Sequence, residues 1–279
     1  MHIIEGLPTA FAVNGGRITD TIIDDRMKTS GLIAAAVIPL LFSCSPKAGV
    51  TESAFGKLST GEPVKLFTIV NHCGASMQLS DYGARIVSVR VPDRDGKLGD
   101  VVVGFGDLEN FEHKDRFIGP VIGRYGNRID HSSFNLDGVH YELVANESFG
   151  GEPVQCHGGP RGFDRFVWES EIVREEDRAG VRFHRLSPDG EQGYPGNMDA
   201  WVTYWLTDDN TVKAEYEAVT DKPTVVNLSN HTYFNLKGDK GGYVMDHLLQ
   251  VEADTCVQNN THFCPDKLLP VDGTPFDFR

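Results

Sequence analysis

The sequence predicts an all-β fold with many strands and few helices. Glycine supplies 30 of the 279 residues, about 11 per cent against a usual figure of about 7 per cent. Turns that contain glycine separate short runs rich in Val, Ile, Phe and Tyr, and this punctuation is typical of strands. The length fits one large β domain or two ordinary ones, since β-sandwiches often reach this size as single units.

Alternation of apolar and polar residues places the first strands. It runs over residues 63–70, resumes over 77–91 and returns over 100–105, and a further strand is predicted over 200–206. Residues 93–96 interrupt the pattern with Asp-Arg-Asp-Gly. A calcium-binding EF-hand loop needs a longer run of ligands that ends in Glu. We therefore predict a Gly-containing turn between two strands at this point.

The charge balance excludes some partners. The net charge is −14 with a pI near 5.1, and the 26 Lys and Arg residues form no basic stripe. Nucleic acid is therefore not expected as a partner, whereas a neutral substrate is compatible with this balance.

Residues 27–44 have the layout of a secretory signal. A cationic start at Met27 and Lys28 precedes an apolar run over 31–42, which is too short to be a comfortable membrane span. The sequence Leu-Phe-Ser-Cys that ends at Cys44 resembles the lipobox of bacterial lipoproteins, in which the Cys carries the lipid. We expect a lipid-anchored protein of the bacterial periplasm or outer membrane, or a cytoplasmic one if the signal is not used.

This interpretation divides the chain. Met27 becomes the true start, residues 1–26 an upstream extension, residues 45–57 a polar tether, and residues 58–279 the β domain. The alternative is that residues 31–42 are a buried core segment.

Residues 224–238 carry the strongest functional signal. In a strand, side chains two apart share a face. One face would then carry hydrogen-bonding groups suited to a polyhydroxy ligand, and the other would pack on the core. The first set is Asn227, Ser229, His231 and Tyr233; the second is Val226, Leu228, Asn230, Thr232 and Phe234. A lone strand His is more often structural than catalytic, but polar company of this kind can tune an imidazole near neutral pH.

Three further segments stand out. Residues 119–129 read Gly-Pro-Val-Ile-Gly-Arg-Tyr-Gly-Asn-Arg-Ile, and because no Lys-Ser/Thr follows, a phosphate-binding loop is a weak interpretation. Residues 155–169 contain His157 followed by two glycines. Residues 187–198 form a Gly-rich loop that includes Glu191, a candidate supporting group, although a loop Glu is usually only solvated.

These segments together resemble one family. Residues 230–236, Asn-His-Thr-Tyr-Phe-Asn-Leu, closely resemble the signature of the aldose 1-epimerases, also called galactose mutarotases. The Gly-Arg-x-x-Asn-Arg-Ile, His-Gly-Gly-x-x-Gly-Phe and Gly-rich segments match the same family, and the resemblance covers most of residues 60–279. It implies a large antiparallel β-sandwich that interconverts the α and β anomers of a free aldose, such as galactose or glucose, without a cofactor.

The resemblance also implies residue roles. His231 would protonate the ring oxygen, and His157 and Arg128 would orient the sugar and stabilise charge. Asn127 and Tyr233 would bind hydroxyl groups. An arginine suits this task because it offers five donors and keeps its charge.

One departure from the family is large. The family's general base is a Glu in the C-terminal part of the domain, near a sugar-binding Asp and Gln, and this chain ends before them. We therefore expect a C-terminally truncated sandwich with exposed edges. Loss of the base alone is expected to raise the barrier by about 3–5 kcal/mol, so little or no catalysis is expected of this chain.

Other functions remain open. A non-catalytic sugar-binding module would not need the base. A mutarotase of hexose 6-phosphates would need an Arg cluster for the phosphate, and none accompanies the motifs. A hydrolase is disfavoured because Gly-x-Ser-x-Gly and spaced paired carboxylates are missing from the sequence.

The five cysteines have neither a disulfide framework nor a metal-site spacing, and no metal is expected. Cys256 and Cys264 would pair only in an oxidising compartment, and two buried thiols are the simpler expectation.

Overall fold

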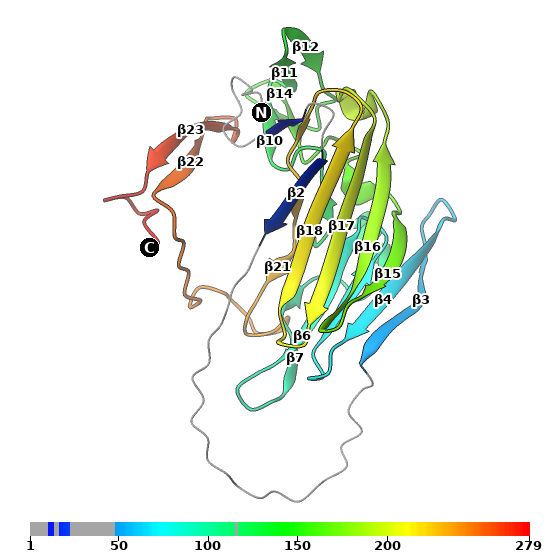
Figure 1. Ribbon diagram of the computed structural model, residues 1–279. Coiled ribbons are helices and arrows are strands. Elements are labelled where there is room, and N and C mark those ends of the chain that lie inside the picture. The colour runs from blue at the N-terminus through cyan, green and yellow to red at the C-terminus, as the bar shows by residue number, and fades with distance from the viewer. Residues whose placement is uncertain (1–10, 14–16, 23–47, 115–116) are drawn as a thin grey trace, which may run out of the picture.

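Two five-stranded antiparallel sheets form the body of the molecule (Figure 1). The computed structural model describes residues 11–13, 17–22, 48–114 and 117–279. The first sheet has the order β15 (Glu169–Arg174), β16 (Arg178–Ser187), β17 (Met198–Thr207), β18 (Val212–Thr220) and β2 (Arg17–Ile22). The second has the order β3 (Gly49–Lys57), β4 (Pro63–Val70), β5 (Ser76–Ser80), β6 (Arg85–Pro92) and β7 (Leu98–Asp100). The predicted all-β antiparallel fold is confirmed.

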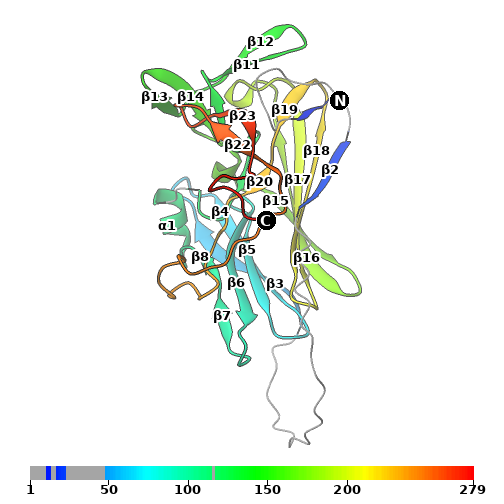
Figure 2. The ribbon, with the colours of Figure 1, turned by 90° about the vertical axis from the view of Figure 1, so that its left-hand side faces the viewer.

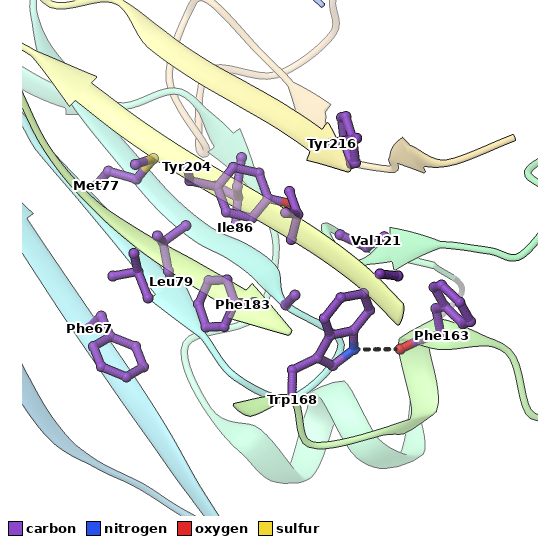
Figure 3. Close-up of a cluster of buried hydrophobic side chains, with 14 of the residues drawn as sticks. Phe67, Met77, Leu79, Ile86, Val121, Phe163, Trp168, Phe183, Tyr204 and Tyr216 are labelled. Atoms are coloured by element: carbon purple, nitrogen blue, oxygen red, sulfur yellow. Dashed lines mark hydrogen bonds between the residues drawn. The ribbon is translucent and has the colours of Figure 1, made fainter. Parts of the chain in front are cut away.

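The core lies between these sheets because their strands alternate in burial. Along β17, Met198, Ala200 and Val202 are buried, whereas the residues between them are partly exposed. Phe183 of β16 meets Phe67 of β4 with ring centroids 5.9 Å apart, so the two sheets contact each other directly. Figure 3 shows this cluster, with the Trp168 indole donating to the Phe163 carbonyl at 3.1 Å.

Short pairings surround this body. They are β1 (Phe11–Val13) with β19 (Thr224–Val226), β8 (Val102–Val103) with β21 (Tyr233–Phe234), β9 (Val121–Ile122) with β20 (Ser229–Asn230), β11 (Ser133–Leu136) with β12 (Val139–Glu142), and β22 (Thr255–Asn259) with β23 (Pro265–Pro270). Residues of β9, β20 and β21 lie at the site. A three-stranded sheet has the order β10 (Arg128–Asp130), β14 (Glu152–Cys156) and β13 (Glu147–Phe149). The described helices are α1 (Leu108–His113) and two 3-10 turns, η1 (Phe163–Arg165) and η2 (Glu191–Gly193).

Several local predictions agree with the structure. The strand predicted over 63–70 is β4, and that over 200–206 lies inside β17. Residues 93–96 form the predicted turn between β6 and β7, in which Asp93 N donates to the Lys97 carbonyl and Gly96 N to the Asp93 carbonyl. Asp93 Oδ1 also accepts from Lys97 N, so this carboxylate serves the turn.

The single strand considered within residues 224–238 is wrong. Three short strands, β19, β20 and β21, replace it and pair with three different partners. The Asn230 amide explains one interruption, because its Oδ1 accepts from Thr232 N at 2.8 Å. The expected core face fails with it: Phe234 is 50% exposed, and Asn230 bonds to Tyr204 instead of packing as an apolar residue would.

The N-terminal part differs from its expected division. Strand β2, within the expected upstream extension, pairs with β18 from Ala214↔Ile22 to Val219↔Arg17. Residues 49–57 form β3 of the second sheet and not part of a polar tether over 45–57. The expected signal segment 27–44, with Cys44, lies outside the described residues. Within the described ranges, no helix is long and apolar enough to cross a membrane.

The four described cysteines are free thiols. Cys256 on β22 lies opposite Leu269 of β23, which leaves it half-buried, whereas Cys264 is buried. The strand register therefore separates the two residues that were considered as a disulfide pair.

Candidate active site

A pocket of about 450 Å³ lies where the three sequence motifs meet. Its walls come from β9 and the loop after it, from the His157 turn, and from residues 227–233. The lining residues are Ile122, Gly126, Asn127, His157, Asn227, Leu228, Ser229, Asn230, His231, Thr232 and Tyr233. Of the predicted site residues, Asn127, His157, His231 and Tyr233 are brought together here.

Backbone hydrogen bonds tie residues 227–231 to the loop around β9. Asn227 N donates to the Arg124 carbonyl at 2.9 Å, and Gly126 N donates to the Asn227 carbonyl at 2.7 Å. His231 is fixed in the same way, because its N–H donates to the Pro120 carbonyl and its carbonyl accepts from Gly119 N. The position of the His231 backbone is therefore set from both sides.

The turn after β14 needs glycine to bring His157 into the pocket. Gly158 has a φ of +88°, and a Cβ there would lie 1.7 Å from the Gly123 carbonyl oxygen. Such a contact is impossible for any other residue without displacement of the backbone. The close approach lets His157 N donate to the Asn127 carbonyl at 3.0 Å.

A second hydrogen bond between Asn127 and His157 fixes the tautomer of the His157 ring. Its Nδ1 accepts from Asn127 N at 2.9 Å, so a neutral ring must carry its proton on Nε2. Burial, together with the nearby His231 and the positive Arg128, lowers the pKa of His157 to about 4. At neutral pH the ring is therefore an uncharged hydrogen-bond donor.

The two imidazoles lie against each other at the pocket. The ring centroids of His157 and His231 are 5.1 Å apart at an interplanar angle of 85°, and the Tyr233 ring is 5.1 Å from His231. Phe117 contacts both histidines, with centroids at 4.7 and 6.0 Å. Sequence reasoning missed Phe117, and its place two residues before the Gly119 motif is the only local signal for it.

Arg128, a predicted sugar-binding residue, is not among the residues that line the pocket. Its Nε donates to Glu147 Oε2 at 2.5 Å and its Nη2 to Oε1 at 3.2 Å, and the guanidinium lies over the Phe149 ring. The carboxylate opposite it raises the pKa of Arg128. Its visible influence on the pocket is electrostatic, through the lowered pKa of His157.

Glu191 is likewise outside the pocket. Its carboxylate pairs with Arg185 Nη2 at 2.7 Å and accepts from the Ser187 hydroxyl. Ser187 in turn accepts from Arg124 Nε at 2.8 Å. Glu191 thus anchors the loop that follows β16.

The chemical inventory of the pocket is neutral. Amides, hydroxyls and two imidazoles line it, and no Asp, Glu, Lys or Arg stands among the described lining residues. Such groups recognise a neutral, hydroxyl-rich molecule, and an imidazole is a side chain that commonly serves in general acid–base catalysis.

Comparisons with known proteins agree with this site. The aldose 1-epimerase family model matches residues 65–279. The chain is 40% identical over 234 residues to a galactose mutarotase of Homo sapiens, covering 83% of this chain and 66% of that protein. It is 41% identical over 220 residues to an aldose 1-epimerase of Escherichia coli (strain K12), covering 78% and 61%. The chain thus spans less than two thirds of the length of the curated relatives it matches here.

Solved structures show the same fold. The crystal structure of a galactose 1-epimerase from Lactobacillus acidophilus NCFM matches with a TM-score of 0.73 and 28% identity, covering 84% of this chain and 66% of that one. An aldose epimerase homologue from C. elegans matches with a TM-score of 0.66 and 32% identity, covering 84% and 64%. The family model, the relatives and the shared fold agree, and the chain belongs to the aldose 1-epimerase family.

Proposed function

We propose that the pocket binds a free aldose, such as galactose or glucose, and takes part in the interconversion of its α and β anomers. The observation that carries this proposal is the contact between His157 and His231 beside a neutral polar pocket. The names of the relatives, galactose mutarotase and aldose 1-epimerase, support the same reaction.

The reaction needs two opposed proton transfers. An acid protonates the ring oxygen while a base removes the proton of the anomeric hydroxyl, and the ring opens to the aldehyde. Rotation about the C1–C2 bond and the reverse steps then give the other anomer. We assign the acid to His231. His157, a neutral donor through Nε2–H, holds a sugar oxygen.

The described lining of the pocket includes no carboxylate that could act as the general base. Each acid or base typically supplies a factor of about 10²–10⁴ in rate. We therefore propose that the 279-residue chain binds the sugar but exchanges its anomers slowly. A small carboxylate supplied in solution should act as the base.

Polarimetry with freshly dissolved α-galactose tests the proposal. The protein-dependent rate should stay close to that of buffer, rise with added formate and saturate, after subtraction of formate's own catalysis. His231→Gln should remove at least about 90 per cent of the formate-dependent rate, because an acid contributes about 10² or more. Saturation-transfer NMR should show galactose bound by both proteins.

Each other outcome is informative. Galactose binding with no anomer exchange, with or without formate, would favour a non-catalytic sugar-binding module. The lack of a carboxylate among the described lining residues is consistent with such a module. Absence of galactose binding would overturn the proposal. Galactose 6-phosphate should bind no better than galactose, because no Arg or Lys lines the described pocket and Arg128 is paired with Glu147.

We also propose that the protein is exported and lipid-anchored through Cys44, on the evidence of residues 27–44 alone. Cleavage before Cys44 would remove β1 and β2, so the mature protein would lack their pairings with β19 and β18. Labelling with radioactive palmitate in a bacterial host should mark the wild type and leave Cys44→Ser unlabelled. An unlabelled wild type would contradict the anchor.

A further inference from the structure

One cluster outside the pocket gathers metal-ligand chemistry. Among the described residues, Asp130, His131 and His262 each offer a ligand atom, and these atoms all lie within 4.8 Å of one another. None of the four described cysteines takes part, which explains why cysteine spacing gives no sign of this site. The cluster does not belong to the sugar pocket, so nothing said of it depends on the proposed function.

The three residues come from two distant parts of the chain. Asp130 ends β10 and His131 follows it, whereas His262 lies in the turn between β22 and β23. Figure 2 shows this hairpin beside β13 and β14. His262 Nδ1 lies 2.8 Å from Asp130 Oδ1, and Asn260 Nδ2 donates to Asp130 Oδ2 at 2.6 Å. The cluster therefore joins segments about 130 residues apart.

A second carboxylate orients His131 as in protein metal sites. Glu152 Oε2 lies 3.3 Å from His131 Nδ1, so an Nδ1–H donates to it and leaves the Nε2 lone pair free. That nitrogen lies 3.9 Å from Asp130 Oδ2. Metal-ligating histidines commonly donate their other N–H to a carboxylate, which fixes the tautomer and the ring orientation.

We propose that Asp130, His131 and His262 bind a divalent transition-metal ion, with Zn²⁺ as the best match, and that the ion fastens the β22–β23 hairpin to β10. Two imidazoles and a carboxylate suit Zn²⁺, whereas Ca²⁺ and Mg²⁺ prefer oxygen ligands. Water would complete a tetrahedron.

The ligand atoms need only modest adjustment, because the close pair His262 Nδ1–Asp130 Oδ1, at 2.8 Å, must separate slightly and the longer distances must shorten. Metal–ligand distances of about 2.0–2.2 Å place tetrahedral ligands about 3.3–3.6 Å apart, against at most 4.8 Å here. The His131 side chain is 58% exposed in a turn, so rotation of its ring can close this distance.

Calorimetry on tag-free protein tests the site. Zn²⁺ should bind one per chain, and Mg²⁺ should produce no heat. His131→Gln and His262→Gln should each weaken Zn²⁺ binding by more than tenfold, and Glu152→Gln by about tenfold, since partners that orient a ligand typically contribute a factor of 10–100. Hydrogen exchange of the β22–β23 amides should slow at least threefold with Zn²⁺ in the wild type, and should not slow in His131→Gln or His262→Gln.

A matched control separates a built site from general imidazole affinity. His72 also faces a carboxylate, with Nδ1 2.9 Å from Asp208, but it belongs to no three-ligand group found in the described chain. His72→Gln should bind Zn²⁺ as the wild type does. The proposal is overturned if the wild type does not bind Zn²⁺, or if His131→Gln, at an exposed position that folding tolerates, binds it unchanged.

Discussion

The environment of single side chains decides much of the chemistry of this protein. The His157 imidazole is neutral because burial opposes its charge, and one backbone N–H selects its tautomer. Burial acts in the same way on the acid Asp81: it raises the pKa of this carboxyl to about 6, although Lys65 N donates to it at 2.9 Å.

His157 should titrate far below an ordinary histidine. We expect the NMR signal of its ring Cε1 to titrate near pH 4, with the proton on Nε2 at pH 7. Because the folded pKa lies below the unfolded value of about 6.5, its contribution to stability is complete above pH 6.5 and is lost as the pH falls toward 4. A midpoint near 6.5, or an Nδ1–H tautomer, would contradict this assignment.

Asp81→Asn should stabilise the protein at alkaline pH. The native pKa of about 6 exceeds the unfolded value of 3.8, so the wild type loses stability as the pH rises between these values. The full difference corresponds to about 3 kcal/mol. Asn keeps the acceptor for Lys65 N without the charge.

Urea unfolding at two pH values checks this prediction. Asp81→Asn should gain up to about 3 kcal/mol at pH 8 and little or nothing at pH 4. Asp95→Asn, in the exposed turn after β6, serves as the control and should show no such difference. A loss of stability at pH 8 would show that the Asp81 charge is needed.

At the scale of elements, tight turns position the site. The His157 turn approaches the loop around Gly123 so closely that Gly158 has no room for a side chain. Residues 224–234 divide into β19, β20 and β21, and this division lets His231 reach the pocket while its backbone stays bonded to Pro120 and Gly119.

Gly158→Ala should therefore damage both stability and the site. A Cβ 1.7 Å from the Gly123 oxygen forces the two loops apart, at a cost of about 3 kcal/mol or more in the free energy of unfolding. Gly150→Ala is the matched control, because its φ is +62° but nothing lies within 4 Å of the added Cβ. It should cost about 1 kcal/mol. Equal losses in urea unfolding would refute the steric argument.

At the scale of the whole molecule, apolar side chains are unevenly buried. The two large sheets enclose the main core, whereas the connection between β21 and β22 forms no strand and exposes apolar side chains. Tyr243 is 87%, Met245 88% and Leu248 100% exposed. Segments with few buried contacts open at low free-energy cost and are cut first by proteases.

Limited digestion with chymotrypsin should first cut this connection. We expect cleavage after Tyr243 or Leu248, which leaves a large fragment that contains both main sheets and His231. Replacement of Tyr243, Met245, Leu248 and Leu249 by Ser should slow the first cut severalfold, as read by mass spectrometry. A first cut inside β15–β18 would show instead that the sheets open before the connection does.

The sequence by itself determined what local patterns encode. Alternation and glycine punctuation were enough for the all-β class, for β4 and for the turn after β6. The resemblance of four short motifs indicated Asn127, His157, His231 and Tyr233, which the structure brings to one pocket. These features depend on neighbours in the chain, so the chain order displays them.

Only the tertiary structure decided the contacts between distant residues. Arg128 pairs with Glu147, Phe117 contacts both histidines, and Asn230 donates a hydrogen bond to the Tyr204 hydroxyl instead of packing on the core. His262 also contacts Asp130, which lies 132 residues earlier in the chain. No periodicity relates such pairs, because three-dimensional packing sets their distances and the local pattern of either segment does not record them.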